Sequence, residues 1–358
     1  MSSEERQLGW DKGPTGLLGD EEGESWWMPQ PMGGYVTLKY VPATFPNNMI
    51  ANGFQVLPAG GEIPQQAHRA CDKLWYVMAG SGEATVDGKV QRVSQGSLVA
   101  GGRNVSMGMR NDGQEDLKIF FTVWPPGLEE AYAAIGRPRT PGDAAPDPFE
   151  APANWKELMR PARWADDESA RGAGLKKGGA LVVGPDESDD FWQPPPGGYI
   201  YLKLSPKNYP SNYMIVGGQV LPPGGFIPSH AHTANEEVLL VVKGSGYVVV
   251  DEQRLAVGPG SLAYVDRWVR HSFVNTGDED MLILVTFHPP GLEKLLSSMG
   301  PRRQKHEQAP DPALFPPMDP AVMAQVLRGA TLCMPDKAME REQVLIPPKL
   351  DGSIDYGD

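Results

Sequence analysis

The sequence predicts an all-β protein made of two tandem barrels of one design, with a few short helices. Its 358 residues are enough for two domains with cores of their own. The 42 glycines and 36 prolines, about a fifth of the chain, suit many short strands joined by tight turns. Apolar runs such as 244–250 and 280–287 are bounded by turn residues and are typical of buried strands.

An internal repeat with a constant offset of 164 residues, as from Gly33 to Gly197, defines the two barrels. The motif Gln-Val-Leu-Pro at 55–58 recurs at 219–222. Further equivalent segments are 80–82 and 244–246, 96–98 and 260–262, 125–129 and 289–293, and 145–148 and 309–312. One offset kept over this length indicates two copies of one fold.

The repeat divides the chain into five parts. We expect an N-terminal arm at 1–27, a first barrel at 28–140, a linker with a second arm at 141–190, a second barrel at 191–305, and a C-terminal helix and tail at 306–358. Short helices are predicted at 154–159 and 319–328. Each barrel is preceded by an acidic stretch and an aromatic pair, at 26–27 and 191–192. Arms of this kind are placed to cross to the opposite barrel and tie the halves together.

Three of the six histidines lie in one pattern in the second copy, together with a glutamate. His230 and His232 alternate along one strand, so both imidazoles point to the same face. Glu237 opens the apolar strand 238–242, and His271 comes from a separate strand. Three imidazoles and one carboxylate suit Fe(II), Zn(II), Mn(II), Ni(II) or Cu(II) and leave positions for water or substrate. The pattern therefore predicts a site for a divalent metal ion.

The spacing of these ligands resembles the motifs of the cupin superfamily. The family's first motif runs Gly-x5-His-x-His-x3/4-Glu-x6-Gly, and here Gly224 begins and Gly244 ends the same spacing. Its second motif ends in His-x3-Asn, which residues 271–275 match. The usual Pro-x-Gly before that histidine is replaced, with Asp266 and Trp268 in its place. The resemblance implies a bicupin, that is, two tandem jelly-roll barrels of the double-stranded β-helix type.

The first copy keeps little of this ligand set. The offset places Gln66, His68, Lys73 and Met107 where the second copy has its four ligands. Lys73 brings an ammonium where a metal needs a carboxylate, and Met107 is a weak ligand for these ions. We therefore expect a metal-free first barrel with a packing role, and one ion per chain. The alternative is that Lys73, desolvated in an apolar barrel, has a depressed pKa and binds or activates an anion.

The positions that alternate with the ligands predict the pocket wall. Interior residues of a small barrel alternate with outward ones, so each ligand fixes the parity of its strand, and Phe226 shares the parity of His230. The predicted wall residues are Tyr199, Tyr201, Met214, Gln219, Phe226, Leu239, Val241, Trp268, Phe273 and Asn275. This apolar and aromatic wall favours a largely apolar substrate that reaches the metal through one or two oxygens.

The ligand set and the repeat together resemble cupin dioxygenases of the quercetinase kind, and segment 289–293 is similar to one common in those bicupins. Gentisate-type dioxygenases typically lack the glutamate, and oxalate decarboxylases keep ligands in both barrels. The resemblance implies a dioxygenase for a small aromatic or enolisable substrate, with Fe(II) favoured and with Glu237 doubling as the catalytic base. Two alternatives stay open: a redox-neutral isomerase, cyclase or lyase at the same site, and a non-catalytic sensor or storage-like bicupin.

Charge and composition narrow the expected partners. The net charge is −13 and the sequence has no basic stripe, so nucleic acid is not expected. The sequence has no apolar stretch of membrane-spanning length and no apolar leader, and Cys71 and Cys333 give no disulfide framework. We expect a cytoplasmic protein whose partners are a small-molecule substrate and, for an oxygenase, O2. A homo-oligomer is compatible with the sequence.

Overall fold

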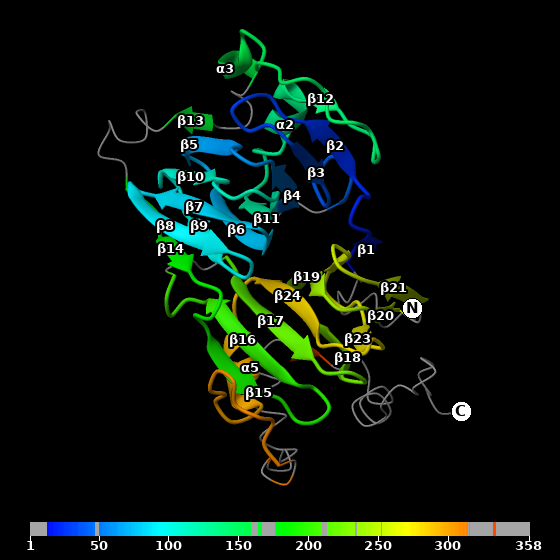
Figure 1. The fold of residues 1–358 in the computed structure, drawn as a ribbon. Helices are drawn as coiled ribbons and strands as arrows, with labels where there is room; N and C mark the ends of the chain where they lie inside the picture. Colours follow the sequence, from blue (N-terminus) through cyan, green and yellow to red (C-terminus); the bar gives the residue numbers. More distant parts are fainter. Residues whose placement is uncertain are drawn as a thin grey trace, which may run out of the picture. The chain divides into compact units, whose positions relative to one another are not determined.

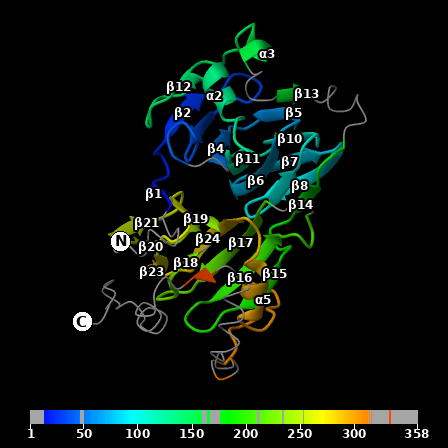
Figure 2. The same ribbon diagram turned by 180° about the vertical axis from the view of Figure 1, so that it is seen from behind.

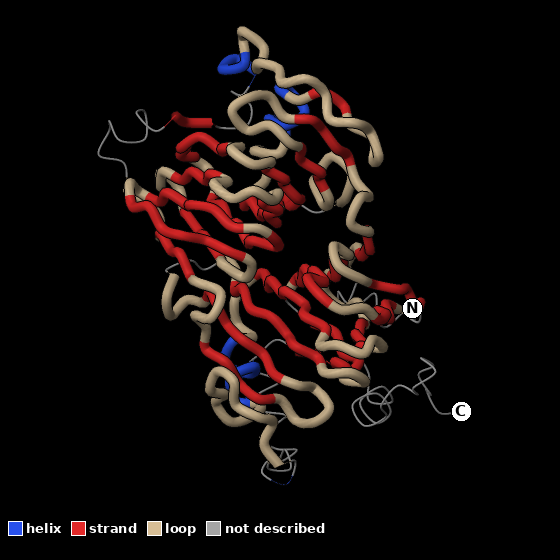
Figure 3. The backbone as a smooth tube through the Cα atoms, viewed as in Figure 1, coloured by secondary structure: helices blue, strands red, loops and turns tan. Residues whose placement is uncertain are grey.

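The computed structural model describes residues 13–46, 50–158, 164–166, 176–209, 213–232, 235–251, 253–311, 313, 315 and 332–333. Two compact units contain them: a first-barrel unit of residues 21–187 and 208–210, and a second-barrel unit of residues 1–20, 188–207 and 211–358. Strands dominate both units and the helices are short (Figure 3). The predicted all-β fold with two tandem barrels is confirmed. No helix in the described part of the chain is long and apolar enough to cross a membrane.

The first-barrel unit contains two sheets that share one core (Figure 1). The eight-stranded sheet has the order β12 (Arg137–Pro138), β2 (Glu24–Trp27), β3 (Tyr35–Leu38), β4 (Ala51–Leu57), β11 (Leu117–Trp124), β6 (Asp72–Ala79), β9 (Leu98–Gly101) and β14 (Ala180–Val183). The five-stranded sheet has the order β13 (Trp164–Asp166), β5 (Glu62–His68), β10 (Met107–Arg110), β7 (Ser81–Val86) and β8 (Lys89–Ser94). The helices are α2 (Glu130–Ile135) and α3 (Trp155–Leu158).

The second-barrel unit repeats this design. Its seven-stranded sheet has the order β1 (Thr15–Leu18), β22 (Leu262–Val265), β19 (Glu236–Lys243), β24 (Met281–His288), β17 (Ile215–Leu221), β16 (Tyr199–Leu204) and β15 (Asp189–Trp192). Its five-stranded sheet has the order β21 (Gln253–Val257), β20 (Gly246–Val250), β23 (His271–Asn275), β18 (Phe226–His232) and β25 (Leu332–Cys333). Figure 2 shows β25 as the red arrow beside β18. Helix α5 (Glu293–Ser298) follows β24.

Strand alternation builds the two cores in the same way. Every second residue of β11 and of β24 enters the interior, while the residues between them face outward. The inward sets are Leu117, Ile119, Phe121 and Val123 in the first barrel, and Met281, Ile283, Val285 and Phe287 in the second. Full burial of one such side chain contributes about 1.5–3 kcal/mol. The sheets are therefore held together mainly by these interior stripes.

A repeated glycine ends the long central hairpin strand of each barrel. Gly80 after β6 and Gly244 after β19 have φ angles of 81° and 78°, in the region that favours glycine. A Cβ atom on Gly244 would lie 2.7 Å from the Cα of Met281. The sharp turn at this position therefore requires glycine.

The arms cross over, as the sequence analysis anticipated. Strand β1 precedes the first barrel in the sequence but pairs with β22 of the second-barrel unit, and β14 precedes the second barrel but pairs with β9 of the first-barrel unit. The units accordingly divide at 20/21 and 187/188 rather than at the predicted 27/28 and 190/191. The difference arises because β2 and β15, predicted as parts of the arms, pair with β3 and β16 of their own barrels.

Two helices were predicted outside the barrels. The one expected at 154–159 corresponds to α3, Trp155–Leu158. The one expected at 319–328 lies outside the described residues.

Candidate metal centre

The structure brings the four predicted ligands together at one end of the second barrel. His230 and His232 lie at the end of β18, Glu237 near the start of β19, and His271 at the start of β23. One donor atom from each lies within 4.8 Å of all the others. The shortest separations are from Glu237 Oε2 to His271 Nε2, at 2.7 Å, and to His232 Nε2, at 3.1 Å.

Antiparallel pairing explains this convergence of residues from different parts of the sequence. His230 of β18 is the register partner of His271 of β23, and their ring centroids are 4.3 Å apart. Glu237 belongs to the other sheet, where it pairs with Phe287 of β24. The ring of Phe287 contacts His232 with a centroid separation of 5.4 Å. The two sheets therefore each contribute ligands to the same end of the barrel.

The geometry fits one first-row metal ion. Such ions bind imidazole nitrogen and carboxylate oxygen at about 2.0–2.2 Å, so donors that share an ion lie within roughly 4.3 Å of one another. The observed limit of 4.8 Å requires only a small side-chain adjustment. Four protein donors also leave coordination positions for a substrate or water.

The pKa shifts of three of the four predicted ligands also suit a metal. Burial and the neighbouring imidazoles lower the pKa of His230 well below its ordinary value, and burial lowers that of His232. Burial alone would raise the pKa of Glu237, but the charge of His271 and hydrogen bonds from both imidazoles hold it well below its usual range. Burial lowers the pKa of His271, but the adjacent carboxylate of Glu237 outweighs burial, so the pKa of His271 is raised. The buried negative charge of Glu237 therefore favours a cation at the centre of the cluster.

Backbone carbonyls orient two of the imidazoles. The Nδ1 atom of His230 lies 2.8 Å from the carbonyl oxygen of Pro228, and the Nδ1 atom of His271 lies 3.1 Å from that of Val269. When each Nδ1–H donates to its carbonyl, the lone pair is on Nε2, which faces the cluster. This arrangement is the usual outer support of metal-binding histidines.

Three of the predicted wall residues line the interior. Leu239, Val241 and Phe273 are buried members of the second barrel's core cluster. Two further residues were not predicted: Phe287, which lies against His232, and Ile215, which pairs with Phe287. Neither strand carries a ligand, so only the register between strands, which the sequence does not show, could have placed them.

The prediction for Phe226 is wrong. Its side chain packs on the opposite face of the sheet, against Tyr247, Val249 and Val274. A register shift between Ile227 and His230 interrupts the alternation of β18 against β23. One extra residue in a strand reverses the faces of all residues before it, so parity counted back from His230 fails.

Other predicted wall residues serve the structure away from the ligands. Tyr199 stacks against Trp192 and the guanidinium of Arg303, at 5.7 Å and 3.8 Å. Tyr201 covers Gly218. Neither tyrosine belongs to the interior core cluster. The sequence could not fix which residues of β16 face inward, because this strand carries no predicted ligand.

The side-chain amides of Asn275 and Gln219 form hydrogen bonds with backbone groups. Asn275 Nδ2 donates to the carbonyls of Leu221 and Glu279, and its Oδ1 accepts from the N–H of Gly277. Gln219 donates to the carbonyl of Gly197. The family-like His-x3-Asn spacing therefore ends in a residue whose amide secures a turn, and a role for Asn275 in the wall stays a prediction.

Met214 and Trp268 are the remaining predicted wall residues. Met214 is fully buried, yet its neighbour Ile215, not Met214 itself, joins the interior cluster. Trp268 is half-buried in the loop between β22 and β23, and its backbone N–H donates to the carbonyl of His232 at 2.8 Å. Its φ of 65° marks this loop as a sharp turn. A role for the Trp268 side chain in the wall stays a prediction.

At the equivalent end of the first barrel, the side chains of Gln66, His68, Lys73 and Met107 are all buried. Met107 pairs with Gln66, as His271 pairs with His230. Among the described residues, the second-barrel cluster is the one group of three or more metal-ligating side chains found this close together. The two barrels thus share a position but not its chemistry.

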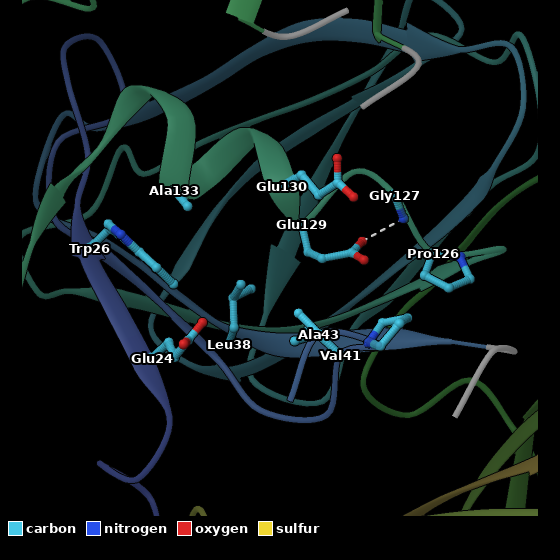
Figure 4. A pocket seen from close by; sticks show the side chains of 11 residues that line it. Glu24, Trp26, Leu38, Val41, Ala43, Pro126, Gly127, Glu129, Glu130 and Ala133 are labelled. Atoms are coloured by element: carbon cyan, nitrogen blue, oxygen red, sulfur yellow. Dashed lines mark hydrogen bonds between the residues drawn. The ribbon is translucent and has the colours of Figure 1, made fainter. Parts of the chain in front are cut away.

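A separate pocket of about 350 Å³ lies beside α2 in the first-barrel unit (Figure 4). Its wall includes Glu24, Trp26 and Glu129. Glu129 Oε2 accepts a hydrogen bond from the N–H of Gly127 at 2.6 Å. Glu293 makes the same bond to Gly291 in the second copy, at 2.8 Å. Because both copies use the glutamate to close the same turn, we assign it a structural role.

Comparison with known proteins agrees with the fold. Residues 53–124 and 218–287, one stretch in each repeat, match the family model described as Cupin domain. An uncharacterised protein of Methanocaldococcus jannaschii is 26% identical over 94 residues, which cover 26% of this chain and 75% of that protein.

Solved bicupin structures superpose on most of the chain. The Escherichia coli protein YlbA has a TM-score of 0.52 at 13% identity, covering 78% of this chain and 92% of its own. Lactobacillus farciminis oxalate decarboxylase in complex with formate has a TM-score of 0.54 at 14% identity, covering 78% and 88%. Procruciferin, an 11S globulin of Brassica napus, also has a TM-score of 0.54 at 14% identity, covering 76% and 85%. At such identities these likenesses show the fold alone.

The fold and the cluster define a duplicated β-barrel protein with a site in its second copy that can hold a metal. The chain belongs to the cupin superfamily, and its two matched domains make it a bicupin.

Proposed function

We propose that this bicupin is a metal-dependent oxygenase of the dioxygenase type, acting on a small, largely apolar or aromatic, metal-chelating substrate in the second barrel. The observation that carries the proposal is the cluster itself: three imidazoles and an ionised carboxylate converge at the end of an interior lined by hydrocarbon. A buried polar group in such surroundings is costly unless it binds something.

We propose Fe(II) as the ion, held by His230, His232, Glu237 and His271. Such an ion, when bound, supplies Lewis acidity and one-electron exchange with O2. The protein's own contribution is to favour neutral His230 and His232 and an ionised Glu237, to orient the imidazoles through Pro228 and Val269, and to surround the site with apolar side chains.

The wall argues for the substrate class. Leu239, Val241, Phe273 and Phe287 offer apolar contact and no charge, so the body of the substrate should be hydrocarbon or aromatic. Its oxygens would then meet the ion. Glu237 is the group placed to accept a proton from a substrate hydroxyl as it binds.

The redox-neutral alternative is less well supported. An isomerase or lyase has to remove a proton at one atom and return it at another, which commonly takes two acid–base groups. In the described part of the second barrel, the titratable groups that converge with one another are the four ligands themselves. Among these described residues the site therefore offers no second acid–base group beside the ligands, and an isomerase or lyase would depend mainly on the ion.

Oxygen uptake by iron-loaded protein tests the proposal. A panel of flavonols, catechols and 1,3-diketones would be screened with an oxygen electrode, with His232→Ala as the matched control. We expect at least one compound to be consumed with O2 in a fixed ratio, and the control to be inactive. Turnover that proceeds equally well without O2, or no uptake across the panel, would contradict an oxygenase.

A further inference from the structure

The first barrel buries an amine at the place that corresponds to the metal centre. Lys73 of β6 is 2% exposed. Its Nζ lies 3.4 Å from His68 Nε2 and 4.4 Å from the centroid of the Trp75 ring. These are the contacts that the structure gives this amine.

No carboxylate in the part of the chain that the structure describes forms an ion pair with Lys73. Among the ion pairs of the described residues, none includes its Nζ. An unpaired ammonium is expensive to bury, so the free amine is favoured. Burial accordingly lowers the pKa of Lys73 to about 7, against a smaller opposing effect of Cys71. A large share of this amine is therefore an uncharged nucleophile near neutral pH.

Two buried groups of β5 at this end of the first barrel, His68 and Gln66, suit the chemistry of an amine that reacts with a carbonyl group. His68 lies within proton-transfer reach, and burial with the nearby Lys73 keeps its pKa well below the ordinary value, so it is a neutral base. Gln66 comes from the same strand, and its buried Oε1 has no hydrogen-bond partner. Such an orphaned acceptor calls for a donor from a ligand.

We propose that the interior of the first barrel is a covalent binding site for a small, uncharged aldehyde or ketone, held on Lys73 as a Schiff base. The Nζ lone pair forms the new bond to the carbonyl carbon, and the carbonyl π pair moves to oxygen. His68 relays the Nζ proton to that oxygen. The resulting hydroxyl can donate to Gln66 Oε1. The C–O bond then breaks as the nitrogen lone pair forms the C=N bond, His68 relays the second Nζ proton to the departing oxygen, and water leaves a neutral imine on Lys73.

An uncharged ligand suits this site better than an anion. The free amine and neutral imidazole bring no fixed positive charge, and the orphaned amide oxygen of Gln66 would repel an anion. The inference does not depend on the proposed oxygenase, because no residue of the second barrel takes part.

Reductive trapping tests the inference on the intact wild-type protein. Propionaldehyde and sodium cyanoborohydride would be added at pH 7.5, and the modified lysines located by peptide mass spectrometry. Lys243, exposed and paired with Glu279, is the surface control. Lys203, also 2% exposed but beside a tyrosine ring, is the buried control. We expect Lys73 to be modified at least tenfold faster than either.

Three further measurements separate the outcomes. His68→Phe should slow trapping at Lys73 about tenfold and leave Lys243 unchanged, whereas equal rates would remove His68 from the step. Pyruvate should trap more slowly than propionaldehyde, and the reverse order would overturn the uncharged-ligand assignment. His232→Ala should leave trapping at Lys73 intact. Labelling of Lys243 while Lys73 stays unmodified in the wild type would overturn the proposal itself.

Discussion

The two barrels of this chain have one scaffold and two different interiors. Asn111 and Asn275 make the same three hydrogen bonds to backbone groups, and the inward stripes of β11 and β24 correspond residue by residue. At the metal position, by contrast, one histidine is shared and the carboxylate of Glu237 is replaced by the amine of Lys73. The comparison separates the residues that make a cupin barrel from the few that give it chemistry.

The largest expected difference follows from removing a ligand. His232→Ala takes away one of four donors and Glu237→Gln replaces the anionic carboxylate by a neutral amide, so metal affinity should fall by on the order of 100-fold or more. Elemental analysis after dialysis measures this, with circular dichroism as a check on folding. The matched control is Glu236→Gln, because Glu236 bonds to the hydroxyl of Tyr264 and lies outside the cluster. Metal loss in that control, with retention in Glu237→Gln, would reverse the assignment of the carboxylate.

The second expected difference is a pH-dependent cost of burying Lys73 in the first barrel, which acts between pH 7 and 10.5. Burial lowers the pKa of Lys73 from 10.5 to about 7. Between those values the unfolded chain holds the proton that the folded chain has released. The free energy of unfolding should therefore rise with pH from 7 to 10.5, by up to about 1.4 kcal/mol per unit, and the full cost should be present below pH 7.

Replacing the amine checks this linkage. Lys73→Met keeps the apolar stem, so the variant should be more stable than the wild type by a few kcal/mol at pH 7 and lose the advantage towards pH 10. Urea unfolding at pH 7, 8 and 9 gives the slopes. Exposed Lys243→Met should keep the wild-type slope. An unchanged slope in Lys73→Met would mean that this amine does not titrate as described.

The smallest effect should be equal in the two barrels. Asn111→Ala and Asn275→Ala each leave buried backbone groups without a partner, which costs about 1–3 kcal/mol. Thermal or urea unfolding should show similar losses for both, and metal content should not change. A specific loss of metal in Asn275→Ala would instead give this residue the role in the pocket that its sequence position first suggested.

The sequence was sufficient for the features that depend on local spacing. The repeat predicted two barrels, and the interval from His230 to His271 predicted which side chains meet. It was insufficient where neighbouring strands decide the outcome. The register shift after Ile227 turns Phe226 outward, and Phe287 reaches His232 only because β24 pairs with β19. Neither the shift nor the pairing leaves a mark in the spacing of a single chain.

The central claim is that one barrel holds a metal and the other does not. The most direct test is the ratio of metal to chain in protein purified without added metal and then saturated with Fe(II) under anaerobic conditions. We predict a ratio near one, falling towards zero in His232→Ala and unchanged in His68→Ala. A ratio near two that returns to one in His68→Ala would contradict the account, because it would place a second ion beside Lys73.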